Sequence, residues 1–320
     1  MDIVACIDKN FVMPTGVMMY SVCVNNADVD IVFHVIKDES VTDKDRIDLE
    51  ETVMAFERKT IVFYDIDVTL FPEFPNVNVD SRVTQASYYR LMLSKILPDN
   101  IDKILYLDGD IIVRYSLLNL WNTELGEKAI AAVTDMSEGV KEYFDRLNYP
   151  VQAGYFNSGV LLINLQYWRE HNVVRLFIDF MVEHEDLIQL WDQDILNAVF
   201  FDKKMTLPVK YNLQKGFLYK EADYDYMRYE KEIIEARKDP VIVHYTGTKP
   251  WVYYSRVPKH PFASLFYKYQ SQTKWKGQKT DNRSYRLRVI NYIADLLRKY
   301  GLKSQLPPLS PEYIDIAPLE

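Results

Sequence analysis

The chain contains 320 residues, of which 48% are apolar and 26% are charged, and its formal net charge is −8. This apolar fraction can bury a substantial core and excludes global disorder, while the negative charge argues against a general nucleic-acid-binding protein. The length suits one large α/β domain, or one domain with an appendage. The 24 tyrosines supply flat apolar surface with a polar tip, which suits sugars and bases but also fills ordinary cores.

Cysteine usage and targeting features both favour the cytosol. Cys6 and Cys23 fall in segments expected to be a buried strand and a buried helix, and two cysteines make neither a disulfide framework nor a zinc site. The first residues lack the basic start and apolar stretch of a signal peptide, and no run of about 18 apolar residues occurs. We therefore expect a cytoplasmic protein.

Short apolar runs alternate with helical patterns in the first part of the chain. Strands are predicted at 3–7, 30–36, 60–64 and 104–107, and helices at 14–25, 43–56 and 81–97. Later strands are expected at 129–133, 157–164 and 241–245, and later helices at 167–185 and 193–200. Continuous apolar strands alternating with helices are typical of a mainly parallel sheet with both faces covered. The sequence therefore predicts an α/β fold.

The C-terminal segment differs from the rest in charge. Between Ser264 and Lys303 there are six Lys and four Arg against two Asp. Apolar residues recur there at helical spacing, namely Leu287, Ile290, Ile293, Leu297 and Tyr300. We expect a catalytic domain over 1–262 and a basic amphipathic extension over 263–320. The extension suits either peripheral contact with the anionic inner face of a membrane or packing on the domain.

Two Asp-x-Asp motifs follow apolar strands, and they predict different enzymes. The first, Asp65-Ile66-Asp67, resembles the nucleophile motif of haloacid-dehalogenase-type phosphatases, in which the first Asp attacks phosphorus and the second is the acid/base. We find no late acidic motif that would complete such a site. The motif also follows the third strand, whereas that family normally opens with it. We favour the alternative interpretation, a solvated acidic turn at a strand end.

The second motif, Asp108-Gly109-Asp110, follows the strand expected at 104–107. Two carboxylates two residues apart project similarly in an extended turn, and a glycine between them lets the backbone approach a ligand closely. Carboxylate oxygens suit Mn²⁺ or Mg²⁺, which can bridge to a diphosphate. The motif alone is a weak signal, and the segments around it give it weight.

Four further segments occur in a distinctive order along the chain: Ala86–Leu91, Asn157–Leu165, Trp191–Asn197 and His244–Trp251. With the second Asp-x-Asp motif, they make the chain resemble glycosyltransferase family 8 from residue 2 to about 251. This family includes glycogenin and the bacterial galactosyl- and glucosyltransferases of lipopolysaccharide and lipooligosaccharide biosynthesis. The resemblance implies a GT-A fold and the transfer of a hexose from a UDP-sugar with retention of anomeric configuration.

The resemblance also implies a metal site and a diphosphate site. Asp108, Asp110 and His244 match the family's metal ligands, and an imidazole beside two carboxylates suits Mn²⁺, with Mg²⁺ as the second choice. Gly247 and Lys249 match the residues that approach the diphosphate, where a lysine supplies a mobile point charge. Some family members have an additional residue between this glycine and lysine, so the loop is shorter here.

Three more positions match donor contacts of the family. Asp8 and Asn10 match residues that contact uridine: a carboxylate can accept from the uracil N–H, and an amide can reach the ribose hydroxyls. A turn or helix-cap residue is the alternative for Asp8. Arg90 matches an arginine that contacts the donor phosphate or sugar, and an exposed helix arginine is the alternative for it.

Asn157, Asp192 and Gln193 match residues around the transferred sugar. The resemblance implies that Asp192 binds sugar hydroxyls and that Gln193 lies under the anomeric carbon on its β-face. Because an amide is a poor nucleophile, we expect front-face return through an oxocarbenium-like ion pair, with the leaving phosphate oxygen taking the acceptor proton. No covalent intermediate is invoked. The run from Asp192 to Asp194 also suits a helix start, where Asp caps well.

We therefore expect a Mn²⁺-dependent, retaining hexosyltransferase that moves galactose or glucose from a UDP-sugar to a glycan or glycolipid such as a lipopolysaccharide core. The donor sugar and the acceptor stay open, and acceptor contacts are expected in the loops 135–156 and 211–238. No tyrosine matches a self-glucosylation motif, so a separate acceptor is favoured over glycogenin-like chemistry. The alternatives are a phosphatase using Asp65 and Asp67 and a non-catalytic nucleotide-sugar-binding protein.

Overall fold

A mixed, mainly parallel sheet of seven strands forms the centre of the described part of the chain. The computed structural model describes residues 1–66, 86–137, 141–218, 226–247, 249–252, 260–279 and 285–304. The strands are β1 (Asp2–Ile7), β2 (Ile31–Lys37), β3 (Lys59–Asp65), β4 (Lys103–Leu107), β6 (Ile130–Thr134), β7 (Phe156–Asn164) and β8 (Lys204–Leu207). Their order in the sheet is β3-β2-β1-β4-β7-β6-β8, and β7 runs antiparallel to both of its neighbours.

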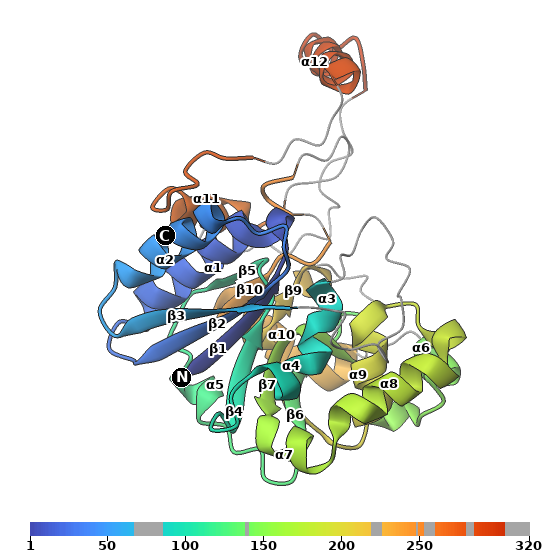
Figure 1. Cartoon of the computed structure of the whole chain (residues 1–320). Helices are drawn as coiled ribbons and strands as arrows, with labels where there is room; N and C mark the ends of the chain where they lie inside the picture. The colour runs from blue at the N-terminus through green and yellow to red at the C-terminus, as the bar shows by residue number, and fades with distance from the viewer. Residues whose placement is uncertain are drawn as a thin grey trace.

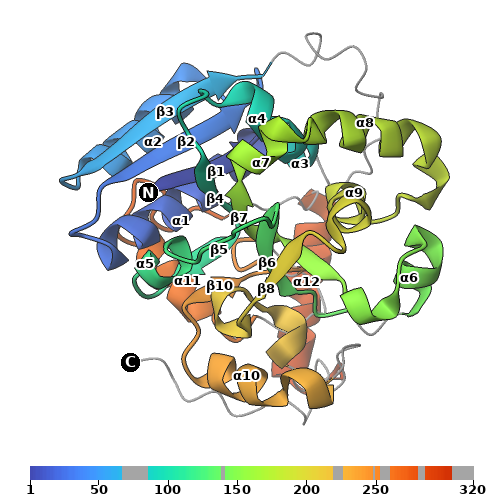
Figure 2. The ribbon, with the colours of Figure 1, turned by 90° about the horizontal axis from the view of Figure 1, so that it is seen from below.

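Helices cover both faces of this sheet (Figure 1). One face carries α1 (Val12–Asn25), α2 (Asp43–Met54) and α11 (Ala263–Gln270). The opposite face, which Figure 2 shows from below, carries α3 (Ala86–Tyr89), α4 (Leu93–Ile96), α7 (Leu165–Glu170), α8 (Val173–Glu183) and α9 (Trp191–Phe200). The remaining helices are α5 (Leu118–Trp121), α6 (Lys141–Leu147), α10 (Tyr226–Lys238) and α12 (Tyr285–Lys299).

The central strands send alternate side chains into two separate cores. In β1, Ile3, Ala5 and Ile7 join the core beneath α1 and α2, whereas Val4 and Cys6 join the core beneath α8 and α9. Strands β4 and β7 alternate in the same way. Because successive residues of a strand point to opposite faces, a sheet covered on both sides needs continuous apolar strands. The predicted α/β fold is therefore confirmed.

The strand order reverses between β1 and β4. The chain runs outward from β1 through β2 to β3 and then returns to the other side of β1 with β4. These two strands are parallel, so their carboxyl ends lie at the same edge of the sheet. Ligands of open α/β sheets bind at such a switch point. Asp8 directly follows β1 and Asp108 directly follows β4, which places both predicted site residues there.

A second, three-stranded sheet brings a distant part of the chain to this edge. It contains β5 (Ile111–Val113), β9 (Leu213–Gln214) and β10 (Ile242–His244) in the order β5-β10-β9. His244 pairs with Ile111 across the antiparallel β5 and β10, and the Tyr245 N–H donates to the Asp110 carbonyl at 2.9 Å. This register places His244 beside the turn that carries Asp108 and Asp110.

Two predicted helices differ from the structure. The helix expected at 167–185 is wrong, because α7 ends at Glu170 and α8 begins at Val173. Between them Asn172 adopts a φ of 47°, a left-handed conformation that asparagine tolerates better than most residues. Within 81–97, residues 86–96 form α3, a 3₁₀ turn and α4 in succession, and residues 81–85 lie outside the described part.

Residues 260–279 pack on the outer side of α1. The Trp275 side chain is buried against Gly16, where an added Cβ would stand 2.1 Å from the indole. The Asn25 amide donates to the Tyr269 hydroxyl at 2.9 Å, and Phe266 is buried in the same core. These contacts attach the segment to the sheet domain, while the division of the chain at residue 262 stays a prediction.

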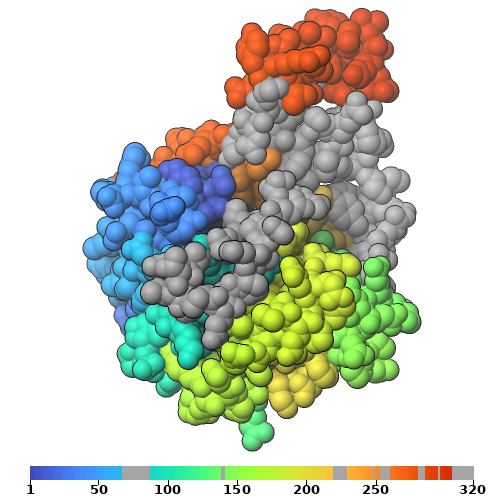
Figure 3. Space-filling view, turned by 45° about the vertical axis from the view of Figure 1, so that its right-hand side comes forward, coloured from blue at the N-terminus to red at the C-terminus, as the bar shows by residue number. Residues whose placement is uncertain are grey.

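The predicted C-terminal helix is present as α12, which projects from one end of the molecule (Figure 3). Several of its large apolar side chains are exposed, among them Leu287, Ile290, Tyr292, Ile293 and Leu297. Among the described residues, no helix combines the length and the apolar content that a bilayer crossing requires.

Candidate active site

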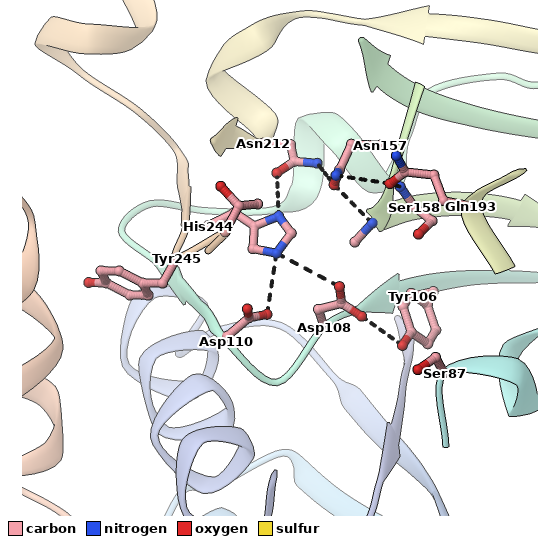
Figure 4. Close-up of polar contacts among 12 residues, drawn as sticks. Ser87, Tyr106, Asp108, Asp110, Asn157, Ser158, Gln193, Asn212, His244 and Tyr245 are labelled. Carbon is pink, nitrogen blue, oxygen red and sulfur yellow. Dashed lines mark hydrogen bonds and ion pairs between the residues drawn. The ribbon is translucent and has the colours of Figure 1, made fainter. Parts of the chain in front are cut away.

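Asp108, Asp110 and His244 form a cluster at the carboxyl end of β4 (Figure 4). The His244 Nε2 atom is 3.7 Å from Asp108 Oδ2 and 3.3 Å from Asp110 Oδ1. One potential ligand atom from each residue lies within 4.8 Å of the others, and no other such group occurs in the described residues. The structure thus brings together the three predicted metal ligands.

The turn that holds the two carboxylates is pressed against the start of α1. A Cβ on Gly109 would stand 2.3 Å from Thr15 Oγ1 and 3.0 Å from the Phe11 ring. Only glycine allows the backbone to pass this close. Gly109 thus allows close packing of this turn on α1, while the approach to a ligand expected from the sequence stays a prediction.

Lys249 lies against Asp110. Its ammonium donates to Asp110 Oδ2 and, at 2.9 Å, to the Tyr245 carbonyl oxygen. Burial acts to raise the pKa of Asp110, but Lys249 and His244 outweigh burial and hold this pKa well below its ordinary value. Asp110 is therefore ionised at neutral pH, as a carboxylate ligand of a metal must be.

Arg90 is buried in the centre of the site, so the exposed-arginine alternative is wrong. Its Nη2 atom is 2.9 Å from Asp108 Oδ1, and its Nη1 donates to the Ser158 carbonyl at 2.8 Å. The guanidinium carbon lies 4.4 Å from the centre of the Tyr106 ring, and Nε is 3.2 Å from Asp192 Oδ2. The guanidinium therefore holds a carboxylate on each side.

One oxygen of Asp192 is buried without a hydrogen bond. Its Oδ2 faces Arg90 Nε, but that N–H donates to the Ser87 carbonyl at 3.0 Å, and no described residue donates to Oδ2. Burial, only partly offset by Arg90, raises the pKa of Asp192 to about 6. Buried unsatisfied acceptors are rare because they are costly, so this oxygen is suited to accept from a ligand hydroxyl.

The Gln193 amide is engaged at both ends. Its Oε1 accepts from Asn157 Nδ2 and from the Ser158 N–H, each at 3.1 Å, and its Nε2 donates to Asp135 Oδ2 at 3.2 Å. Because a backbone N–H can only donate, Ser158 determines which end of the amide is the oxygen. Both lone pairs of that oxygen are therefore used within the protein.

Asp194 anchors the start of α9. It accepts the backbone N–H groups of Gln189 and Leu190, at 2.7 and 2.6 Å, and pairs with Arg146. The N-cap of α9 is Leu190, whose side chain makes no cap bond, so the N-cap alternative for residues 192–194 is not observed. Asp194 instead lies in the first turn of α9, where negative charge is favourable, and its carboxylate ties the preceding loop to the helix.

These groups line a pocket of about 280 Å³. The predicted site residues in its wall are Arg90, Asp108, Asp110, Asp192, Gln193 and Lys249. Phe11 and Trp191 add aromatic surface to it. A polar wall with aromatic surface is the combination that sugar and nucleotide ligands require.

Five predicted site residues do not line this pocket, namely Asp8, Asn10, Asn157, His244 and Gly247. Asp8 lies in the connection from β1 to α1, where its Oδ1 accepts the Asn10 and Phe11 N–H groups at 2.8 and 3.2 Å. The cap alternative for Asp8 is therefore observed, and Asn10 is exposed beside it. Gly247 follows β10 with a φ of 72° and has open space on its Cβ side, a conformation that favours glycine.

Three residues that contact predicted site residues, namely Asp135, Asn212 and Gly159, were not themselves predicted. Asp135 follows β6 and contacts Gln193 and Asn157, and its burial raises its pKa. Asn212 is fully buried, 2.9 Å from His244 Nδ1, and Gly159 lies against the His244 ring. Asp135 and Asn212 fall inside the loops expected to bind acceptor, where no periodic pattern separates buried from exposed residues.

The first Asp-x-Asp motif lies elsewhere. Asp65 ends β3, an edge strand of the sheet, where its largely exposed side chain pairs with Lys37. Asp67 lies outside the described residues. No metal-like cluster of the described residues includes Asp65. The contacts of Asp65 are those of an acidic turn at a strand end.

Comparisons with known proteins agree with this geometry. A family model described as glycosyl transferase family 8 matches residues 2–255. The chain is 31% identical over 280 residues to General stress protein A of Bacillus subtilis (strain 168). This alignment covers 86% of the chain and 94% of that protein. It is 29% identical to lipopolysaccharide 1,3-galactosyltransferase of Salmonella typhimurium, over 84% of this chain and 77% of that protein.

A solved structure supports the same conclusion. The crystal structure of galactosyltransferase LgtC in complex with donor and acceptor sugar analogs matches with a TM-score of 0.75 and 29% identity. The match covers 87% of this chain and 99% of that chain, which confirms the predicted GT-A fold. By sequence and by structure, the chain belongs to glycosyltransferase family 8.

Proposed function

We propose that this protein is a retaining hexosyltransferase that moves galactose or glucose from a UDP-sugar to a glycan or glycolipid acceptor such as a lipopolysaccharide core. One observation carries the proposal: in a family 8 chain, two carboxylates that line a polar pocket at the sheet's switch point form a cluster with an imidazole. The names of the lipopolysaccharide glucosyl- and galactosyltransferases among its relatives support the sugar and acceptor classes.

The donor set suits Mn²⁺, with Mg²⁺ as the second choice. Asp108, Asp110 and His244 would hold the ion, because an imidazole beside two ionised carboxylates is a set that Mn²⁺ accepts. Asp110 is ionised and buried, and a cation there would balance its charge. A bound ion would neutralise the diphosphate and stabilise UDP as the leaving group.

The residues that follow β1 and β10 would bind the nucleotide. Asp8 and Asn10 lie at the switch point, where the uridine of the donor would contact them. Phe11, beside them, adds an aromatic face to the pocket wall. Lys249 would exchange its contact with Asp110 for the diphosphate, and Gly247 would let the backbone approach the same phosphates.

The transferred hexose would lie against Asp192 and Gln193. The unsatisfied Oδ2 of Asp192 would accept a sugar hydroxyl, and Arg90 would keep this carboxylate in place. Both lone pairs of Gln193 Oε1 are occupied, so this amide would stabilise positive charge by its dipole and would not attack. This supports front-face return through an ion pair, with the leaving phosphate oxygen taking the acceptor proton.

The basic C-terminal helix suits a membrane-bound acceptor. α12 exposes apolar side chains such as Leu287 and Ile290, and Arg298 and Lys299 lie in its last turn. A basic amphipathic helix of this kind lies on anionic lipid surfaces. We therefore propose peripheral contact with the inner face of a membrane.

A ligand-dependent stability assay tests the function. The melting temperature would be measured with UDP-galactose, UDP-glucose and UDP alone, each with and without Mn²⁺. A ligand at 100 times its Kd stabilises the folded state by about 2.7 kcal/mol. We expect stabilisation by UDP-sugar only with Mn²⁺ and its loss in Asp110→Asn, while Asp65→Asn behaves as wild type. Stabilisation independent of Mn²⁺, or unchanged in Asp110→Asn, would reject the proposed site.

A further inference from the structure

A chain of three hydrogen bonds connects a backbone amide of β7 to the ring of His244 (Figure 4). The Gly159 N–H donates to Asn157 Oδ1 at 3.0 Å. Asn212 Nδ2 donates to the same oxygen at 2.8 Å, and Asn212 Oδ1 lies 2.9 Å from His244 Nδ1. Asn157 and Asn212 are both buried, so water does not compete for these bonds.

The direction of every bond in this chain is determined by its first member. The Gly159 N–H can only donate, so the atom of Asn157 that faces it must be the oxygen. That oxygen can only accept, so Asn212 must turn its NH₂ group toward Asn157 and its carbonyl oxygen toward His244. The ring nitrogen that faces this carbonyl must therefore carry a proton.

With the proton on Nδ1, Nε2 is the ring nitrogen left for a metal. Nε2 is the atom that faces Asp108 and Asp110, at 3.7 and 3.3 Å. A ligating histidine whose other nitrogen donates to a fixed acceptor keeps one tautomer and one ring orientation. Gly159 serves this arrangement twice, because its N–H starts the chain and its missing side chain leaves room for the ring.

The same amide also reaches the sugar side of the pocket. Asn157 Nδ2 donates to Asp135 Oδ2 at 3.0 Å and to Gln193 Oε1 at 3.1 Å. Its two N–H groups and both lone pairs of its oxygen are thus all used, which leaves it no free group for a substrate hydroxyl. Asn157 therefore bonds Gln193 directly and His244 through Asn212, so a shift of Asn157 would move both side chains.

We propose that Asn212 is a positioning residue that fixes the tautomer of His244 for metal binding, and that Asn157 is the hub that couples this ligand to Gln193. The inference rests on the proposed function, since it concerns the same metal site. It assigns Asn157 a role in holding the pocket rather than in contacting the sugar. Replacing Asn212 should weaken metal binding roughly 10- to 100-fold, the usual effect of losing the partner of a ligating histidine.

Mn²⁺ binding to the nucleotide-free protein, followed by electron paramagnetic resonance, tests the role of Asn212. Asn212→Leu removes both hydrogen-bonding groups at similar volume. We expect it to bind Mn²⁺ roughly 10- to 100-fold more weakly than wild type. Asn212→Asp keeps an oxygen toward Nδ1 but sets its second oxygen against Asn157 Oδ1, which also only accepts. We therefore expect it to bind Mn²⁺ more tightly than Asn212→Leu but less tightly than wild type. Asn26→Leu is the matched control, because Asn26 is equally buried and hydrogen-bonded at the far end of α1. Wild-type affinity in a folded Asn212→Leu protein would overturn the inference.

A second measurement needs no substitution at Asn212. In metal-free, ¹⁵N-histidine-labelled protein at alkaline pH, the His244 signal is assigned by its loss in His244→Gln among five histidines. We expect a protonated Nδ1 and an unprotonated Nε2, and the opposite tautomer would contradict the proposal. If wild-type protein binds no Mn²⁺, the proposed function fails; if Asp110→Asn abolishes binding but Asn212→Leu does not, only this inference fails.

Discussion

Gly159 lies against His244 so closely that a Cβ on Gly159 would stand 2.3 Å from the imidazole Cε1. The same Cβ would be 2.7 Å from Asp108 Oδ2. Gly159→Ala should therefore displace two metal ligands at once and weaken Mn²⁺ binding at least tenfold, as loss of ligand geometry does. Isothermal titration with Mn²⁺ measures this.

The control for this substitution is a glycine with open space around it. Gly277 has a φ of 75°, and no atom of the described residues lies within contact distance of a Cβ added there. Gly277→Ala should cost about 1 kcal/mol of stability through backbone strain and leave Mn²⁺ affinity unchanged. Equal Mn²⁺ affinity in Gly159→Ala and Gly277→Ala would show that the ligands tolerate the methyl group.

Lys249 holds the carboxylate of Asp110, which is a proposed metal ligand. In the metal-free protein its ammonium holds that carboxylate, so a cation must displace it. Lys249→Met should raise the affinity for Mn²⁺ alone, by about tenfold for each 1.4 kcal/mol of lost competition. The same change should weaken UDP binding in the presence of Mn²⁺, because a charged phosphate contact is lost.

The two affinities should therefore move in opposite directions, which titrations with Mn²⁺ and with UDP can resolve. Lys210→Met, at an exposed position beside Tyr211, is the control and should change neither affinity. Parallel weakening of both in Lys249→Met would mean that Lys249 supports the metal rather than competing with it.

Asp192 should make stability depend on pH. Its folded pKa of about 6 lies above its ordinary value of 3.8, because burial disfavours the charged form. The folded state therefore binds this proton more tightly than the unfolded state. The resulting stability is fully present below about pH 4 and is lost as the pH rises through 6.

Asp192→Asn removes this titration while keeping the shape. The free energy of unfolding of metal-free Asp192→Asn, minus that of wild type, should rise by on the order of 1–3 kcal/mol from pH 4 to pH 7.5. The reason is that one pKa unit corresponds to about 1.4 kcal/mol. Urea unfolding at the two pH values measures the difference. Asp186→Asn, at an exposed position, is the comparison. A stability difference between Asp192→Asn and wild type that is the same at both pH values would contradict the assignment of this pKa to Asp192.

Truncation should distinguish the role of residues 260–279 in folding from the role of α12 in membrane contact. A chain ending at residue 279 keeps Trp275 packed on α1 and should fold, but it should not co-sediment with phosphatidylglycerol vesicles because α12 is gone. A chain ending at 304 keeps α12 and should bind as the full chain does. A chain ending at 262 loses Trp275 and Phe266 from the core and should melt at a much lower temperature. Equal vesicle binding by the 279 and 304 chains would exclude α12 as the contact.

The cluster of Asp108, Asp110 and His244 could be predicted because two simple rules locate it. A parallel strand ending in Asp108 places that residue at the sheet's ligand-binding edge, and family motifs supply His244. The apolar runs likewise predict the central strands, since burial on both faces demands them. Sequence patterns of this kind predict which strand residues are buried and which residues follow a strand end.

Asn212 and Asp135 could not be found in this way. Each acts through side-chain hydrogen bonds made by a segment without periodic structure, so neither leaves a hydrophobic pattern. The break at Asn172 was missed for a related reason: apolar spacing on either side continues, and the left-handed turn depends on one backbone angle. Family motifs point to Arg90, which lies in the pocket wall, but its pairing with Asp108 and Asp192 becomes visible only in three dimensions.

The packing of Trp275 on Gly16 has a consequence for synthesis on the ribosome. α1 leaves the exit tunnel long before the indole that covers it, because Trp275 lies far downstream of α1 in the chain. Until then α1 keeps an uncovered apolar surface, and partly folded chains of this kind are prone to aggregate. Because α1 also supports the turn at Gly109, we expect a nascent chain to fix the turn that carries Asp108 and Asp110 only after residue 275 has emerged.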